Sequence, residues 1–182
     1  VDIADADFVF SSRWPQLTEL DLQLDFINND LFMSSPTAKL QGVNVSKMSA
    51  HIMQLSNAQE VVIDAYGQTT GADLTALILE SNLANSLGSV LDRGVIIDGS
   101  VASTLSLTVP FHGDEVIAKG TASLLESDVA IPAIDVTFNS ARGSVSFVNE
   151  TIQASSVSAE LLGQTVVLDF FGEQGDSRYD LN

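Results

Sequence analysis

Hydrophobic and polar residues alternate with a period of two along most of this chain. The clearest stretch has Leu20, Leu22, Leu24 and Phe26 at alternate positions, separated by Asp21, Gln23 and Asp25. Successive side chains of a β-strand point to opposite faces, so this spacing places large apolar groups on one face and acids on the other. Similar alternation recurs at 101–111, 116–124 and 166–170. The pattern predicts a mainly β protein built from half-buried antiparallel strands.

Residues 22–45 have a related stretch 121 positions later, at residues 143–166. Eight of the 24 aligned positions are identical without a gap, where average composition would give about one or two. Each copy predicts an alternating strand, a tight polar turn and a second strand that ends at a glycine. Pro36 interrupts the second strand of the first copy and predicts an edge position or a bulge. We interpret the pair as a β-hairpin module laid down more than once along an extended sheet. The identical pairs are Phe26/Phe147, Asn28/Asn149, Ser34/Ser155, Ser35/Ser156, Ala38/Ala159, Leu40/Leu161, Gly42/Gly163 and Val45/Val166.

One region departs from the strand pattern and has the features of a helix start. Residues 70–73 resemble a capping box, in which side-chain oxygens of Thr70 and Asp73 accept from amide N–H groups of the first turn. Leu74 and Leu77 then fall on one helical face. We therefore predict one or two short α-helices around residues 73–91.

The composition excludes several classes of partner. Of the 182 residues, 24 are acidic and seven are basic, which gives a net charge of −17. Nucleic acids and anionic membrane surfaces are bound through Lys and Arg, so we expect neither as a partner. The chain has no cysteine, which excludes disulfides and thiolate zinc sites. No uncharged apolar run reaches about 18 residues, so no transmembrane segment is predicted.

No residues form a recognisable catalytic or metal-binding constellation. His51 and His112 lie far apart in the sequence, and neither has a ligand or triad partner at a telling spacing. The sequence lacks a G-x-S-x-G elbow, an H-E-x-x-H helix and a phosphate-binding loop. Acids on the strands mostly alternate with apolar residues, which places them on a solvated face rather than paired in a cleft. We therefore expect a protein that is not an enzyme, with no catalytic residues, no metal site and no cofactor.

Several short motifs, each weak alone, occur in order between Trp14 and Phe170. Their order and spacing resemble the periplasmic part of the YhdP proteins, which belong to the AsmA-like group and are related to TamB. The motifs are Trp14-Pro15-x-Leu17, Phe26-x-Asn28 with Leu31, Leu40-x-Gly42-Val43-x-Val45, Ser86-Leu87-Gly88 with Leu91-Asp92, Leu105-x-Leu107-x-x-Pro110, and Val116-x-Ala118-Lys119-Gly120.

The resemblance implies a segment of a long Gram-negative envelope protein that is anchored in the inner membrane and reaches across the periplasm. The implied fold is an elongated, curled antiparallel β-sheet whose apolar groove carries phospholipid towards the outer membrane. The implied role is phospholipid transport between the membranes and lipid homeostasis of the outer membrane. The implied partners are phospholipid acyl chains and neighbouring repeats of the same chain. The start at Val1, without methionine or signal peptide, likewise leads us to expect that residues 1–182 are a single fragment of a larger repeat-containing domain.

The candidate site is therefore the apolar face of the predicted sheet. Acyl chains would lie along it, stabilised by about 0.8 kcal/mol for each buried methylene, while the head groups stay in water at the open edge. The residues expected to line this face are Leu22, Leu24, Phe26, Leu105, Leu107, Val109, Phe147, Leu161, Leu168 and Phe170.

Three alternatives compete with a lipid groove. Alternation by itself favours a closed β-sandwich, in which the apolar faces of two sheets pack together as an ordinary core. The resemblance to the YhdP proteins reverses that preference. A β-domain for adhesion or for protein or carbohydrate binding is a second alternative, although such a module would display aromatic platforms and the sequence has a single tryptophan, Trp14. A structural spacer without a ligand is the third.

Overall fold

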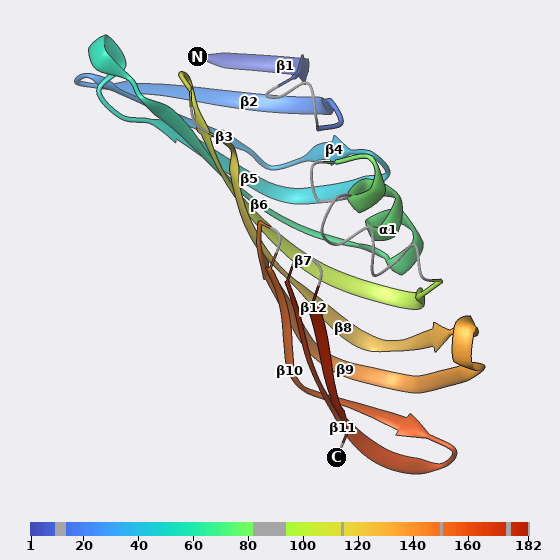
Figure 1. Ribbon diagram of the computed structural model, residues 1–182. Coiled ribbons are helices and arrows are strands. Elements are labelled where there is room, and N and C mark those ends of the chain that lie inside the picture. The colour runs from blue at the N-terminus through green and yellow to red at the C-terminus, as the bar shows by residue number, and fades with distance from the viewer. Residues whose placement is uncertain (10–13, 82–93, 114, 150, 174–175, 182) are drawn as a thin grey trace.

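The computed structural model describes residues 1–9, 14–81, 94–113, 115–149, 151–173 and 176–181. Within these ranges, twelve strands form one antiparallel sheet (Figure 1). Eleven of them pair in the order of the sequence, from β1 at one edge to β12 at the other, and the short β4 pairs with both β2 and β5. The predicted mainly β, antiparallel fold is confirmed. The closed sandwich is wrong, because the described strands make a single layer.

The strands and short helices have the following bounds: β1 (Asp2–Phe8), β2 (Leu17–Ile27), β3 (Asp30–Ser35), β4 (Ala38–Leu40), β5 (Val43–Ile52), η1 (Leu55–Asn57), β6 (Glu60–Thr70), α1 (Gly71–Leu79), β7 (Ile96–Pro110), β8 (Ile117–Ile131), η3 (Pro132–Ile134), β9 (Val136–Val148), β10 (Thr151–Leu161), β11 (Gln164–Glu173) and β12 (Asp176–Leu181).

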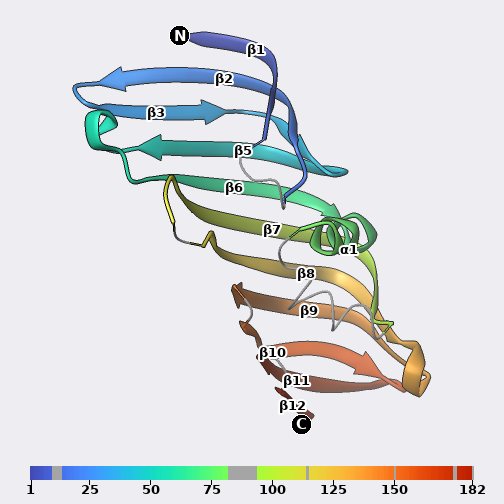
Figure 2. The ribbon, with the colours of Figure 1, turned by 45° about the horizontal axis from the view of Figure 1, so that its top comes forward.

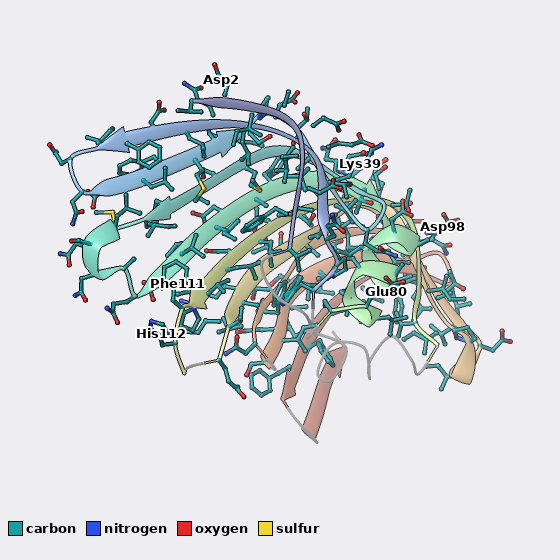
Figure 3. All side chains as sticks on the ribbon, turned by 90° about the horizontal axis from the view of Figure 1, so that it is seen from above. Asp2, Lys39, Glu80, Asp98, Phe111 and His112 are labelled. Atoms are coloured by element: carbon teal, nitrogen blue, oxygen red, sulfur yellow. The ribbon has the colours of Figure 1, made fainter. Side chains whose placement is uncertain are left out.

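The sheet is strongly curled. Seen from above, its strands arch over, and α1 lies beneath the arch (Figure 3). The view of Figure 2 shows that α1 covers one end of the central strands, while η1 and the turn between β2 and β3 lie at the opposite end. The concave face is therefore the face on which α1 packs, mainly against β7 and also against β6 and β5.

Bulges are a physical cause of the curl. In β1, β2, β8, β9 and β10 an extra residue has positive φ, 51 to 62°, at Asp5, Glu19, Glu126, Ser140 and Ser156. The strand register shifts beside each of these positions. A bulge of this kind bends the strand and increases its twist. It also exchanges the faces of the residues that follow, which keeps the apolar side chains on the concave side.

Three of the bulges are capped by an aspartate from the neighbouring strand. The N–H of Asp5 donates to Oδ1 of Asp21 at 3.3 Å. The N–H of Ser140 donates to Oδ1 of Asp128 at 2.8 Å, and the N–H of Ser156 donates to Oδ1 of Asp169 at 2.7 Å. All three contacts lie on the exposed side. These acids therefore bond bulge amides that the ladder leaves without a partner.

Positive φ recurs at the spacing of the predicted repeat. Gln41-Gly42 and Leu162-Gly163 each have positive φ at two consecutive residues between paired strands, as type I′ hairpin turns require. Positive φ recurs at this spacing even before residue 22, where the sequence similarity begins, because the bulge residues are also 121 positions apart. The positions 121 residues apart that share positive φ are Asp5/Glu126, Glu19/Ser140, Asn28/Asn149, Gln41/Leu162 and Gly42/Gly163.

The predicted helix is confirmed at its start. Its N-cap is Thr70, whose Oγ1 accepts from the N–H of Asp73 at 3.1 Å. The Asp73 carboxylate accepts from the Thr70 hydroxyl at 2.8 Å, where the prediction gave it an amide donor. The helix begins at Gly71, two residues before the predicted range, and ends at Leu79. The second predicted helical turn, at 82–91, lies outside the described residues.

The expectation for Pro36 is wrong in part. This proline lies between β3 and β4, and both of these strands are flanked by β2 and β5. The position is therefore inside the sheet, not at its edge. The missing N–H is accommodated by a break in the strand, where the Ser35 hydroxyl donates to the carbonyl oxygen of Thr37.

Candidate functional site: the apolar concave face

Apolar side chains form continuous rows across the concave face. One row runs from strand to strand through directly paired residues: Met48, Ala65, Leu105, Gly120, Phe147 and Ile152. Gly120 is small for a steric reason. A Cβ there would come within 2.6 Å of the Phe147 ring and 2.4 Å of the Thr104 carbonyl oxygen, so only glycine lets the ring lie against the sheet.

The predicted lining residues divide between two clusters. In the first cluster, Leu107 is almost fully buried, 2% exposed, and Leu22, Leu105, Val109 and Phe147 are half-buried around it. In the second cluster, Leu161, Leu168 and Phe170 are half-buried. Leu24 is half-buried outside both clusters, and Phe26 is 61% exposed. The structure therefore places eight of the ten against a common apolar layer and two beyond its margin.

Helix α1 bridges the two clusters. Leu77 is buried in the first cluster and Leu74 packs against the second. The first residue of the helix, Gly71, lies in close contact with β7. A Cβ at this position would lie only 2.3 Å from the carbonyl oxygen of Ile97, so the close approach requires glycine. Part of the concave face is thus covered by the chain itself, and the described residues include no second sheet over the rest.

Away from its margins the convex face is mainly polar and carries short hydroxyl ladders. Thr104 and Thr121 share a hydrogen bond of 2.7 Å, and Ser123 and Ser144 share one of 2.8 Å. Several acids of this face have a defined structural task in capping bulges. Sequence reasoning placed such acids on the solvated face but missed that task, because a bulge is visible only once the strand partners are known.

The described residues include both histidines, and neither belongs to a cluster of metal-ligand type. No group of three or more His, Cys, Asp or Glu side chains lies together among them. His51 stacks on Phe32, with ring centroids 6.4 Å apart and an interplanar angle of 28°. His112 lies exposed in the turn between β7 and β8. What the arrangement provides is apolar area on a curved surface, which suits the binding of an apolar ligand.

Comparison with known proteins identifies the family. The family model described as "YhdP protein" matches residues 1–182, the whole chain. The chain belongs to the YhdP family. The resemblance predicted from its motifs is thereby confirmed.

A curated relative supports the same assignment. The chain is 33% identical over 181 residues to the "Intermembrane phospholipid transporter YhdP" of Escherichia coli (strain K12). The match covers 100% of this YhdP-family chain but only 14% of that relative. No solved structure matches the chain. Within the described part of the chain, no helix is long and apolar enough to cross a membrane.

Proposed function

We propose that the concave face is a section of a lipid-carrying surface that takes part in phospholipid transport between the inner and outer membranes. The observation that supports this most directly is the single apolar layer, which is curled, lacks a covering sheet among the described residues, and occurs in a family that includes an intermembrane phospholipid transporter. The parent protein would be periplasmic and anchored in the inner membrane, with neighbouring repeats continuing the surface. No catalytic step and no cofactor is involved.

The dimensions suit acyl chains. Eleven successive strands at about 4.8 Å spacing would extend for about 50 Å along the sheet before curvature is considered. One leaflet of a bilayer core is about 15 Å thick, so an extended acyl chain fits well within this section. Each methylene that leaves water for the apolar face contributes about 0.8 kcal/mol, whatever the head group.

The ten predicted lining residues would have graded roles. Leu107, being buried, would support the surface rather than touch the ligand. The half-buried Leu105, Phe147 and Leu24 would contact acyl chains directly. Phe26, the most exposed of the set, would contact them at the margin.

The decisive experiment is an Asp scan in the full-length parent protein with lipid transport as the readout. Leu24→Asp should abolish transport by placing a charge on the apolar path, because a buried unpaired carboxylate costs several kcal/mol. Gln23→Asp is the matched control: Gln23 is exposed on the opposite face, and its variant should transport normally. Leu107→Asp is unsuitable, because the 2% exposure of Leu107 means that this charge would unfold the sheet. Normal transport by Leu24→Asp would refute the proposal in favour of a structural spacer.

A further inference from the structure

We propose that acyl chains enter and leave the concave face sideways, across the rim formed by the β2–β3 turn, η1 and the adjacent ends of β7 and β8. This rim is called the η1 rim below. The inference rests on the proposed function and adds a direction to it: lipid is exchanged over one long side of the section rather than solely along its axis.

The η1 rim carries large apolar side chains that are open to solvent. Soluble surfaces seldom gather so many large apolar groups along one margin unless something binds there. The exposed fractions are 61% for Phe26, 54% for Ile27, 38% for Phe32, 50% for Met53, 43% for Phe111 and 41% for Ile117.

At this rim the apolar surface continues around to the convex face. Phe32, Val62 and Ile117 belong to one convex-face row close to the rim, which also contains Asp25, His51 and Thr108. Two residues further along the same strands, the convex face is polar.

The polar row consists of Ser34, Ser49, Asp64, Ser106 and Lys119. The change from apolar to polar within two residues confines the apolar surface to a lip. Apolar side chains on both sides of the lip let a methylene cross the edge without full exposure to water.

The opposite rim is built differently. Figure 3 shows Phe111 and His112 at the η1 rim, and Lys39, Glu80 and Asp98 at the other. On that second rim α1 covers the strand ends, and Lys39 forms an ion pair with Glu19 at 2.8 Å. This rim also exposes apolar side chains, among them Ile96 (55%) and Ile134 (64%). A lipid tail that crossed at the strand ends under α1, however, would have to displace the packed helix. The η1 rim also has charged groups, including Asp30 and Glu60, but within the described residues no α-helix packs on its strand ends. It is therefore the side on which the chain itself leaves the concave face uncovered.

Hydrogen bonds hold the lip in place. The N–H of Leu55 donates to the carbonyl oxygen of Asn29 at 2.6 Å, and the Asn29 side chain donates to Ser56 at 2.9 Å. The N–H of Gln54 donates to Oδ1 of Asp30 at 2.8 Å. These bonds fasten η1 to the β2–β3 turn, so the apolar side chains form one fixed surface rather than separate loop tips.

The test compares the rate of lipid uptake with the amount bound. The purified 182-residue chain is mixed with phosphatidylethanolamine/phosphatidylglycerol vesicles containing a self-quenched fluorescent phospholipid. Stopped-flow dequenching gives the rate, and native mass spectrometry gives the lipid bound at equilibrium. The rim variant combines Ile27→Ser, Phe32→Ser and Ile117→Ser, all at exposed positions outside the packed clusters. The control combines Ile96→Ser, Leu125→Ser and Ile134→Ser, which are also exposed but lie away from the η1 rim.

The rim variant should take up lipid about tenfold more slowly, the effect of leaving about two methylenes in water while the tail crosses the edge. Its bound lipid at equilibrium should match the wild type, and the control variant should match it in both measurements. An unchanged rate in the rim variant, or equal slowing in both variants, would overturn sideways loading. If the wild-type chain binds no lipid at equilibrium, both the proposed function and sideways loading are refuted. If the wild-type chain binds lipid but the rim variant takes it up at an unchanged rate, only sideways loading is refuted.

Discussion

Replacing Leu107 with alanine tests whether one curled layer can support a genuine core. Leu107 is 2% exposed and pairs directly with Ile63 on β6 and Ala118 on β8, which are themselves buried. The change removes three carbon atoms, which at about 0.8 kcal/mol each amounts to about 2.4 kcal/mol of lost transfer free energy. Core substitutions of this type cost about 2–5 kcal/mol when the cavity is included. We expect about 3 kcal/mol, because neighbours on an open face can partly collapse into the space.

Urea unfolding followed by the fluorescence of Trp14 measures this loss directly. Trp14 is 5% exposed within the same cluster, so its emission reports on the layer that Leu107 supports. The urea midpoint should fall with little change in the m-value, and the melting temperature should fall by about 6–12 °C. Leu24→Ala, at a half-buried site outside both clusters, should cost about 1 kcal/mol or less. A loss below about 1 kcal/mol for Leu107→Ala, or equal losses in the two variants, would show that the apolar layer is not a core.

Three further outcomes follow from the structure. Asp169→Ala should lower the free energy of unfolding by about 0.5–1.5 kcal/mol in urea titrations, because the Ser156 amide loses its acceptor. Thr70→Ala should cost about 0.5–2 kcal/mol and speed hydrogen exchange of α1 amides, because the helix loses its N-cap. Added NaCl between about 20 and 500 mM should raise the urea midpoint, because screening weakens the self-repulsion of a net charge of −17.

Each outcome has a result that contradicts it. Asp64→Ala changes an exposed acid of the same face that caps no bulge, so equal destabilisation by this variant would remove the special role of Asp169. Unchanged exchange in α1 after Thr70→Ala would show that packing of Leu77, not the cap, sets the helix start. A urea midpoint that is flat or falls with salt would show that local ion pairs outweigh the net charge.

The alternation in the sequence was enough to predict the sheet, but not its bends. The apolar positions of β9 change from even to odd numbers: Val136 and Phe138 precede the bulge at Ser140, and Ala141 and Val145 follow it. In a list of residues such a change looks like the end of one strand and the start of another. Ser140 itself gives no warning, because serine has no special preference for positive φ, and its capping acid, Asp128, comes from another strand.

For the candidate site, the sequence predicted which residues form the apolar face but not how deeply each is buried. Alternation identified the side chains of the apolar face, including Leu105 and Phe147. It could not separate the buried Leu107 from the half-buried Leu24, because burial depends on which residues face each other across strands. The apolar lip was also hidden. Phe32 and Ile117 occupy positions of the polar face, so period-two counting treats them as exceptions rather than as a shared margin.

The strand order has a consequence for how such a molecule is made. Since nearly every strand pairs with the next one along the chain, each segment finds its partner within a few tens of residues of its own synthesis. Short-range pairing of this kind keeps the entropy of loop closure low and favours rapid assembly. The sheet can therefore form progressively from one edge as the polypeptide emerges, with a single growing strand exposed at any moment. Adding or removing a hairpin therefore changes the length of the sheet and leaves the pairing of all preceding strands intact.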